Sequence, residues 1–188
     1  WLSRASRLHL QAEMIRDQAL ATSGLMVETV GGASTRPYQP PGLWKEIASQ
    51  VYQQGSGMEL YRRSMYTFWK RTVPPPTMLT FDAVSREICV LQRSRTNTPL
   101  QALAMLNEVA FVEAARNLGQ RMIVQGGTTD EDRLSWGWRC LTARYPTKFE
   151  LNVLKKTLHG SRQRYQADRE SAKQLVAFGE STAKAEID

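Results

Sequence analysis

A chain of 188 residues with 41% hydrophobic residues is long enough to bury the core of one ordinary domain, and this composition excludes wholesale disorder. No apolar run approaches the length of a bilayer-spanning helix. The formal net charge is +7, and residues 61–95 alone hold seven basic residues against two acidic ones, an excess of +5. Such a field attracts polyanions or an acidic partner protein, unless its arginines pair with acidic side chains of the same fold or cover apolar surface.

The chain starts at Trp1 without a methionine, so we expect an internal piece of a longer polypeptide whose targeting signal lies upstream. Its two cysteines, Cys89 and Cys140, are most simply small side chains in or near a core. No C-x-x-C-H occurs, so this segment attaches no c-type haem covalently, and we expect no cofactor in it. His9 and His159 have no matching set of ligands, which argues against a structural zinc site.

A first helix is predicted between Ser3, as its cap, and Gly24, as its stop. Glu13 and Asp17 share one face of this helix, with Arg16 beside them. Two carboxylates and an arginine can serve as acid, base and clamp, but no second catalytic group is near them in the sequence. We therefore favour an ion-pair cluster that ties this helix to a neighbouring segment.

Glycines and prolines in residues 30–42 predict an extended connector, and residues 43–54 then predict a short helix from apolar positions four residues apart. Residues 58–82 interleave aromatic and basic side chains. Such a pattern can stack nucleic-acid bases, or stack sugar rings and seat sulfate groups. Helical spacing of the aromatic residues favours the plainer interpretation, a helix with an aromatic core face and a basic rim, ended by the run VPPPT.

The next helix start is specified by a capping box, in which Thr98 and Gln101 flank Pro99 at the first helical position. Arg93 and Arg95 lie just upstream of this helix N-terminus. Their position suits an anion seat, and it equally suits docking of an acidic side chain from the same fold.

This helix is predicted to turn a stripe with Leu100, Leu103 and Leu106 toward the core, and a second, collinear or bent helix follows it to Gly126. Three more helices are predicted after caps at positions 129, 147 and 168. No alternating, strand-like run appears. The predicted fold is therefore all-α, an irregular multi-helix bundle with long Pro/Gly-rich connectors, in one domain over residues 1–188.

Three long stretches resemble a known family, namely RLHLQAEMIRDQALATSGLM, GGASTRPYQPPGLWKEIA and the passage from Leu60 to Leu118. The chain resembles the C-terminal domain of unknown function in planctomycete multidomain proteins of the cytochrome-c type. That resemblance implies an exported, periplasmic or cell-envelope protein with haem c on an upstream domain. It carries no catalytic assignment, and its motif positions here are Glu13, Arg16, Asp17, Arg62, Arg63, Trp69, Lys70, Arg71, Asp82, Arg86, Glu87, Arg93, Arg95, Thr96, Asn97 and Thr98.

Four functional hypotheses follow from these observations. The first is a non-catalytic helical module that docks against upstream domains of the same polypeptide. The second is binding or processing of sulfated or acidic polysaccharide through the Arg/aromatic belt of residues 61–95, and nucleic-acid binding is disfavoured by the exported context. An enzyme would use Asp82, Glu87 and the Arg93–Arg95 region, although catalytic sequence motifs are absent. The candidate ligand-binding residues are Arg62, Arg63, Trp69, Lys70, Arg71, Asp82, Arg86, Glu87, Arg93, Arg95 and Asn97.

Overall fold

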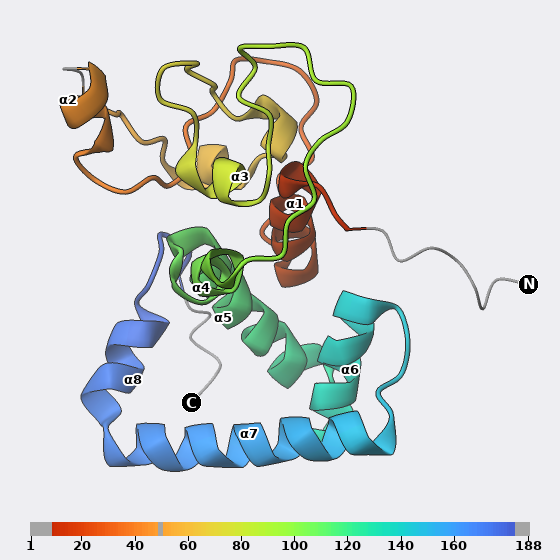
Figure 1. Cartoon of the computed structure of the whole chain (residues 1–188). Coiled ribbons are helices and arrows are strands. Elements are labelled where there is room, and N and C mark those ends of the chain that lie inside the picture. The colour runs from red at the N-terminus through yellow and green to blue at the C-terminus, as the bar shows by residue number, and fades with distance from the viewer. Residues whose placement is uncertain (1–8, 49–50, 183–188) are drawn as a thin grey trace, which may run out of the picture. The chain divides into compact units, whose positions relative to one another are not determined.

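Eight α-helices and two 3₁₀ turns form the regular structure of residues 9–48 and 51–182, which are the residues that the computed structural model describes. This described part holds isolated β-bridges but no strand, so the predicted all-α class is confirmed (Figure 1). None of its helices is both long and apolar enough to cross a bilayer. The elements are α1 (Ala12–Ser23), α2 (Leu43–Ala48), η2 (Gly57–Tyr61), η3 (Ser64–Tyr66), α3 (Pro76–Thr80), α4 (Pro99–Asn107), α5 (Val109–Gln125), α6 (Asp130–Thr142), α7 (Lys148–Ala167) and α8 (Arg169–Val176).

The chain divides into two compact units. Unit 1 contains the residues up to Asp17 and Val27–Glu108, and unit 2 contains Gln18–Met26 and the residues from Val109 onward, so α1 contributes to both. The prediction of one domain over residues 1–188 stays a prediction.

Helix α1 is shorter than predicted, because residues 9–11 before Ala12 are not helical. The cap predicted at Ser3 lies outside the described residues. The predicted stop is confirmed, since Gly24 has a φ of +77° and donates its amide to the carbonyl oxygen of Ala21 at 3.1 Å. A left-handed residue directly after a helix is the position that glycine favours.

Irregular backbone makes up most of unit 1, and the helix predicted before the prolines is wrong. The aromatic passage pairs with the connector instead: the Thr35 amide donates to the Tyr66 oxygen at 2.8 Å, and the Phe68 amide donates to the Thr35 oxygen at 2.7 Å. Backbone groups bonded across thirty residues cannot also close helical turns. The prolines start a helix rather than end one, because Pro76 is at the beginning of α3, where a missing N–H costs nothing.

The helix predicted over residues 43–54 ends at Ala48, and residues 51–54 are not helical. Its Trp44 is nevertheless buried, and the Trp44 ring packs against the Tyr52 ring with 5.2 Å between centroids. The aromatic residues therefore do form a core in unit 1, but they come from α2, turns and coil rather than from one helix face.

Helix α4 confirms the predicted capping box and corrects the predicted stripe. The Thr98 hydroxyl accepts from the Gln101 amide, and the Gln101 side chain accepts from the Thr98 amide. The leucines expected to face inward are exposed instead, with exposed fractions of 58% for Leu100, 57% for Leu103 and 74% for Leu106. The nine residues of this helix therefore present an uncharged apolar surface to solvent.

Gln101 explains the orientation of α4. Its side chain is buried, and its amide nitrogen donates to the Thr80 carbonyl and to the Thr96 hydroxyl, both at 3.0 Å. A buried amide needs such partners, and they lie only on the side of α4 opposite the leucines. The polar side of the helix therefore faces the interior of unit 1.

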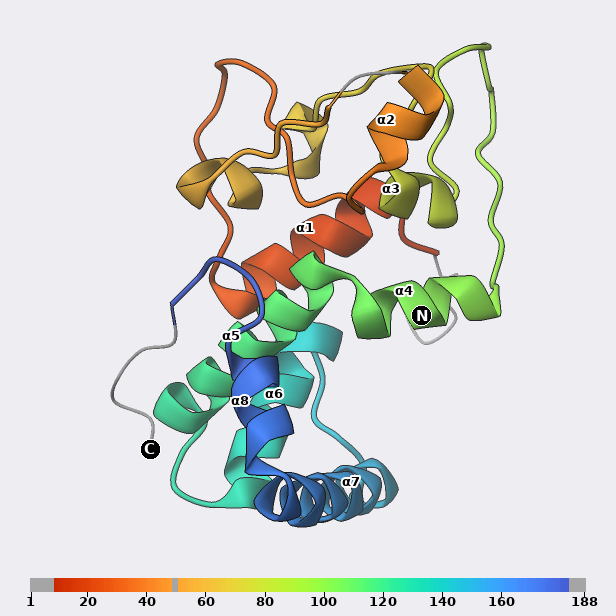
Figure 2. The same ribbon diagram turned by 90° about the vertical axis from the view of Figure 1, so that its left-hand side faces the viewer.

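Unit 2 is built from α5 to α8, and the predicted caps and helices are all present there. In both ribbon views α6 and α8 lie on the same side of the long helix α7 (Figures 1 and 2). Helices α5 and α6 approach closely at Gly137, where a Cβ atom would lie 2.7 Å from the Met122 sulfur. Ion pairs of Arg162 with Asp130 and of Lys155 with Glu131 join α7 to the first turn of α6.

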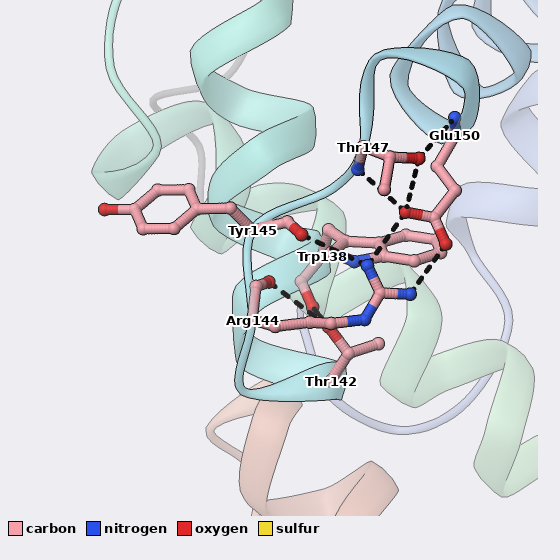
Figure 3. Close-up of polar contacts among 6 residues, drawn as sticks. All are labelled: Trp138, Thr142, Arg144, Tyr145, Thr147 and Glu150. Atoms are coloured by element: carbon pink, nitrogen blue, oxygen red, sulfur yellow. Dashed lines mark hydrogen bonds and ion pairs between the residues drawn. The ribbon is translucent and has the colours of Figure 1, made fainter. Parts of the chain in front are cut away.

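The corner between α6 and α7 is fixed by one arginine (Figure 3). The Arg144 guanidinium donates to both Glu150 oxygens at 2.6 and 2.8 Å and lies 5.1 Å from the centre of the Trp138 ring. Glu150 also accepts from the Thr147 amide at 2.8 Å in the predicted capping box of α7. Hydrogen bonds from Arg144 and then Thr147 lower the pKa of Glu150 to about 2.

Candidate functional site

The acidic and basic residues of α1 fasten the turns of unit 1. Arg16 is 7% exposed, and its guanidinium donates to the carbonyl oxygens of Leu60 at 2.6 Å and Arg62 at 2.9 Å, and to the Ser64 hydroxyl at 3.1 Å. Burial lowers the pKa of Arg16, although the neighbouring Asp17 carboxylate opposes that shift. A buried guanidinium whose donors meet backbone carbonyls is a structural clamp.

The two carboxylates of α1 complete this cluster. Asp17 accepts from the Ser64 amide at 2.7 Å and lies 3.9 Å from Arg63, and Glu13 accepts from Arg93 at 2.6 Å. Burial alone would raise the pKa of Glu13, but the Arg93 hydrogen bond and charge hold it below its ordinary value. The predicted ion-pair cluster is confirmed, since Glu13 and Asp17 pair with arginines of other segments, while Arg16 donates to carbonyl and hydroxyl oxygens.

The cations of the aromatic belt lie over rings of their own unit. The Arg62 guanidinium lies 4.0 Å from the Tyr66 ring centre, and the Lys70 ammonium lies 4.7 Å from that of Trp44. Arg86 lies 4.5 Å from the ring centre of Trp69. Each such contact contributes about 0.5–1 kcal/mol at an exposed position. These stacked faces are occupied, so they do not offer open platforms for bases or sugar rings.

Arg62 also closes the connector. Its guanidinium donates to the Ala33 oxygen at 3.0 Å, to the Thr29 oxygen at 3.1 Å and to the Gly31 oxygen. Trp69 similarly donates its indole N–H to the Ser85 oxygen at 3.2 Å. Two of the candidate ligand residues therefore hold loops in place.

One concave feature of unit 1 is a hollow of about 330 Å³ beside the start of α1. Its lining residues come from the segment before α1, from the residues after α3 and from the loop before α4. Figure 2 shows how this loop runs to the start of α4. It brings together three of the predicted candidates, namely Asp82, Arg93 and Arg95. His9, which the sequence singled out only as a residue without metal partners, also lines it.

Asp82 lines the hollow, and hydrogen bonds hold its carboxylate in place. It has a positive φ of 62°, and its carboxylate accepts from the Thr96 amide at 2.7 Å and from the Thr96 hydroxyl at 2.9 Å. The hydrogen bond from that amide is the main cause of a lowered pKa at Asp82. A carboxylate with a lowered pKa and occupied oxygens is a weak general base.

The remaining candidates are spread over the surface. Glu87 is exposed, and in the described part of the chain the exposed side chains of Arg71, Arg95 and Asn97 make no hydrogen bond or ion pair. Only Arg95 among these four lines the hollow. The sequence predicted the capping role of Gln101 but gave no sign of its bond to Thr80 or of the place of His9 in the hollow, because both depend on segments brought together by the tertiary fold.

The described residues hold two free thiols and no cluster of metal-binding side chains. Among residues 9–48 and 51–182, no group of three or more His, Cys, Asp and Glu side chains could hold a metal ion. Cys89 and Cys140 are free thiols. Cys89 is exposed on the loop before α4, so its predicted place in or near a core is wrong.

These features define an all-α protein whose charged residues chiefly fasten its own loops. The model of the family PSD1, protein of unknown function (DUF1553), matches residues 1–158, and the chain belongs to this family. The matched part includes α1, the aromatic belt, α4 and the hollow. No curated protein and no solved structure matches the chain.

Proposed function

We propose that the chain is a non-catalytic helical module that docks through the leucine face of α4 onto other domains of the same polypeptide. The observation that carries the proposal is the exposure of Leu100, Leu103 and Leu106, each more than half exposed, on a helix without a charged residue. Apolar residues gathered on one exposed surface typically mark an interaction site.

The proposal also concerns the cellular location of that polypeptide and the nature of its upstream domain. The likeness of residues 7–118 to planctomycete cytochrome-c-type proteins supports an exported, periplasmic or cell-envelope protein with haem c on an upstream domain. Under this proposal the haem belongs to the upstream domain, and the present chain supplies a surface rather than a reaction.

The arrangement of charged residues supports a non-catalytic role. Asp82 and Glu13 are bound to Thr96 and Arg93. An enzyme would instead need a group that is free to exchange a proton beside a reacting atom. Binding of sulfated or acidic polysaccharide along the whole belt of residues 61–95 has less support, because three of its seven cations already stack on aromatic rings of unit 1, and the same holds for nucleic acid.

The experiment is a binding measurement between this chain and the separately produced upstream part of the polypeptide. Replacing Leu103 and Leu106 together by glutamine removes two apolar anchors, and we expect at least about a tenfold weaker Kd. Met58→Gln is the matched control, because Met58 is 74% exposed in unit 1 but lies on η2. Equal affinity of the leucine variant and the control would reject the proposal.

A further inference from the structure

We infer that the hollow beside α1 binds a small carboxylate ligand that also carries hydroxyl groups, with Arg95 as its anion-binding residue. This inference does not depend on the docking proposal, because the hollow and the leucine face of α4 share no residue.

The hollow is held open by two clamps on one loop. Arg93 is fixed to Glu13 of α1 at 2.6 Å, and Thr96 is fixed to Asp82 at 2.7 Å through its amide. Arg95 lies between these two fixed points. Its backbone is thereby restrained, which reduces the entropy that is lost when a ligand binds.

The charged side chains at the hollow differ in whether they already have partners. Both carboxylates near it, Glu13 and Asp82, already accept hydrogen bonds, whereas the Arg95 guanidinium has no hydrogen bond or ion pair with any described residue. The available charge in the hollow is therefore positive. A planar guanidinium matches a carboxylate in geometry and binds it with two parallel hydrogen bonds.

The rest of the lining indicates what else the ligand carries. Ser94, Gln11 and Gln92 supply hydroxyl and amide groups that can donate and accept, which suits the hydroxyl groups of a ligand. Leu91 and Phe81 supply apolar surface against which the C–H groups of a ligand can pack. A volume of about 330 Å³ lies at the lower end of ordinary ligand pockets, so it suits one small ring rather than a polymer segment.

The test is a titration of the 188-residue chain followed by two-dimensional NMR with three probes. Glucuronate carries a carboxylate and hydroxyl groups, acetate carries only the carboxylate, and glucose carries only hydroxyl groups. We expect glucuronate to bind with a Kd on the order of 1 mM, acetate at least several-fold more weakly and glucose not at all. Shifted amide signals should fall in residues 9–11, 81–82 and 90–95.

Arg95→Gln should weaken glucuronate binding at least about tenfold, since it removes a charge-assisted pair of hydrogen bonds. Arg71→Gln is the matched control, because Arg71 is also exposed and unpaired among the described residues but does not line the hollow. Equal losses in both variants would mean attraction by net charge and would overturn the inference. Absence of shifts in the hollow with the unaltered chain at 50-fold the expected Kd would overturn it without any variant.

Discussion

The guanidinium of Arg16 donates to the carbonyl oxygen of Leu60 at 2.6 Å, and both residues are buried. This bond joins α1 to a turn forty-four residues later in the chain. The same side chain reaches Arg62 and Ser64, so one residue satisfies three acceptors in a stretch whose regular structure is limited to two short 3₁₀ turns. In unit 1, Arg16 therefore supplies hydrogen bonds that backbone N–H groups supply within helices and sheets.

Replacing Arg16 by methionine should destabilise the chain by about 3 kcal/mol. The variant keeps most of the apolar stem but leaves buried acceptors unpaired, and each such group costs about 1–3 kcal/mol. Urea unfolding followed by circular dichroism measures the change. Arg71→Met, at an exposed position without a described partner, should change stability by less than about 0.5 kcal/mol. An Arg16 variant as stable as this control would show that the clamp is dispensable.

Glu13 should make stability dependent on pH in the acid range. Its folded pKa is lowered, so its contribution is fully present above its ordinary pKa of 4.5 and is lost as the pH falls through the lower folded value. Glu13→Gln should therefore lower Tm at pH 7, and the gap to the unaltered chain should narrow toward pH 3. Thermal unfolding at a series of pH values measures this gap. Glu28→Gln is the control, because Glu28 is exposed, and its Tm should stay close to that of the unaltered chain at every pH. A Tm difference for Glu13→Gln that stays constant with pH would contradict the role given to Glu13.

Two glycines of unit 2 should respond to alanine in opposite directions. Gly179 has a φ of +88°, and a Cβ atom there would lie 2.3 Å from the Cδ atom of Glu113, which is buried. Gly179→Ala should cost about 1–3 kcal/mol from backbone strain and displacement of that carboxyl group. Gly160 lies within α7 with open space around its Cα, so Gly160→Ala should stabilise by about 0.5–1 kcal/mol. Urea unfolding of both variants tests the pair, and two changes of the same sign would contradict it.

The structural features that the sequence predicted correctly are those specified by short local motifs. The capping boxes at Thr98 and Thr147 each lie within four residues of chain, and both are present with their expected bonds. The side chains that cap α6 and α8, Thr129 and Asp168, are likewise as expected. Such motifs need no information from distant segments.

The features that the sequence did not predict correctly depend instead on contacts between distant segments. The aromatic passage has helical periodicity, but the Tyr66 oxygen accepts from Thr35 in the connector. The leucines of α4 have the spacing of a core stripe, but the buried partners of Gln101 decide which side of the helix faces inward. The hollow around Arg95 exists because Glu13 and Asp82 hold a loop from two sides. Contacts between distant segments leave no trace in the spacing of residues along one segment.

The most direct test of the docking proposal is thiol labelling of α4 in the short chain and in the longer polypeptide that includes the upstream domains. Leu106→Cys and Met58→Cys, each made with Cys89 and Cys140 replaced by serine, place a thiol at two positions that are both 74% exposed in this structure. We predict similar labelling rates for the two in the short chain. In the longer polypeptide, labelling at position 106 should slow at least about tenfold while position 58 stays fast, since docking would remove the leucine face from solvent. Equally fast labelling of both positions in the longer polypeptide would contradict the account.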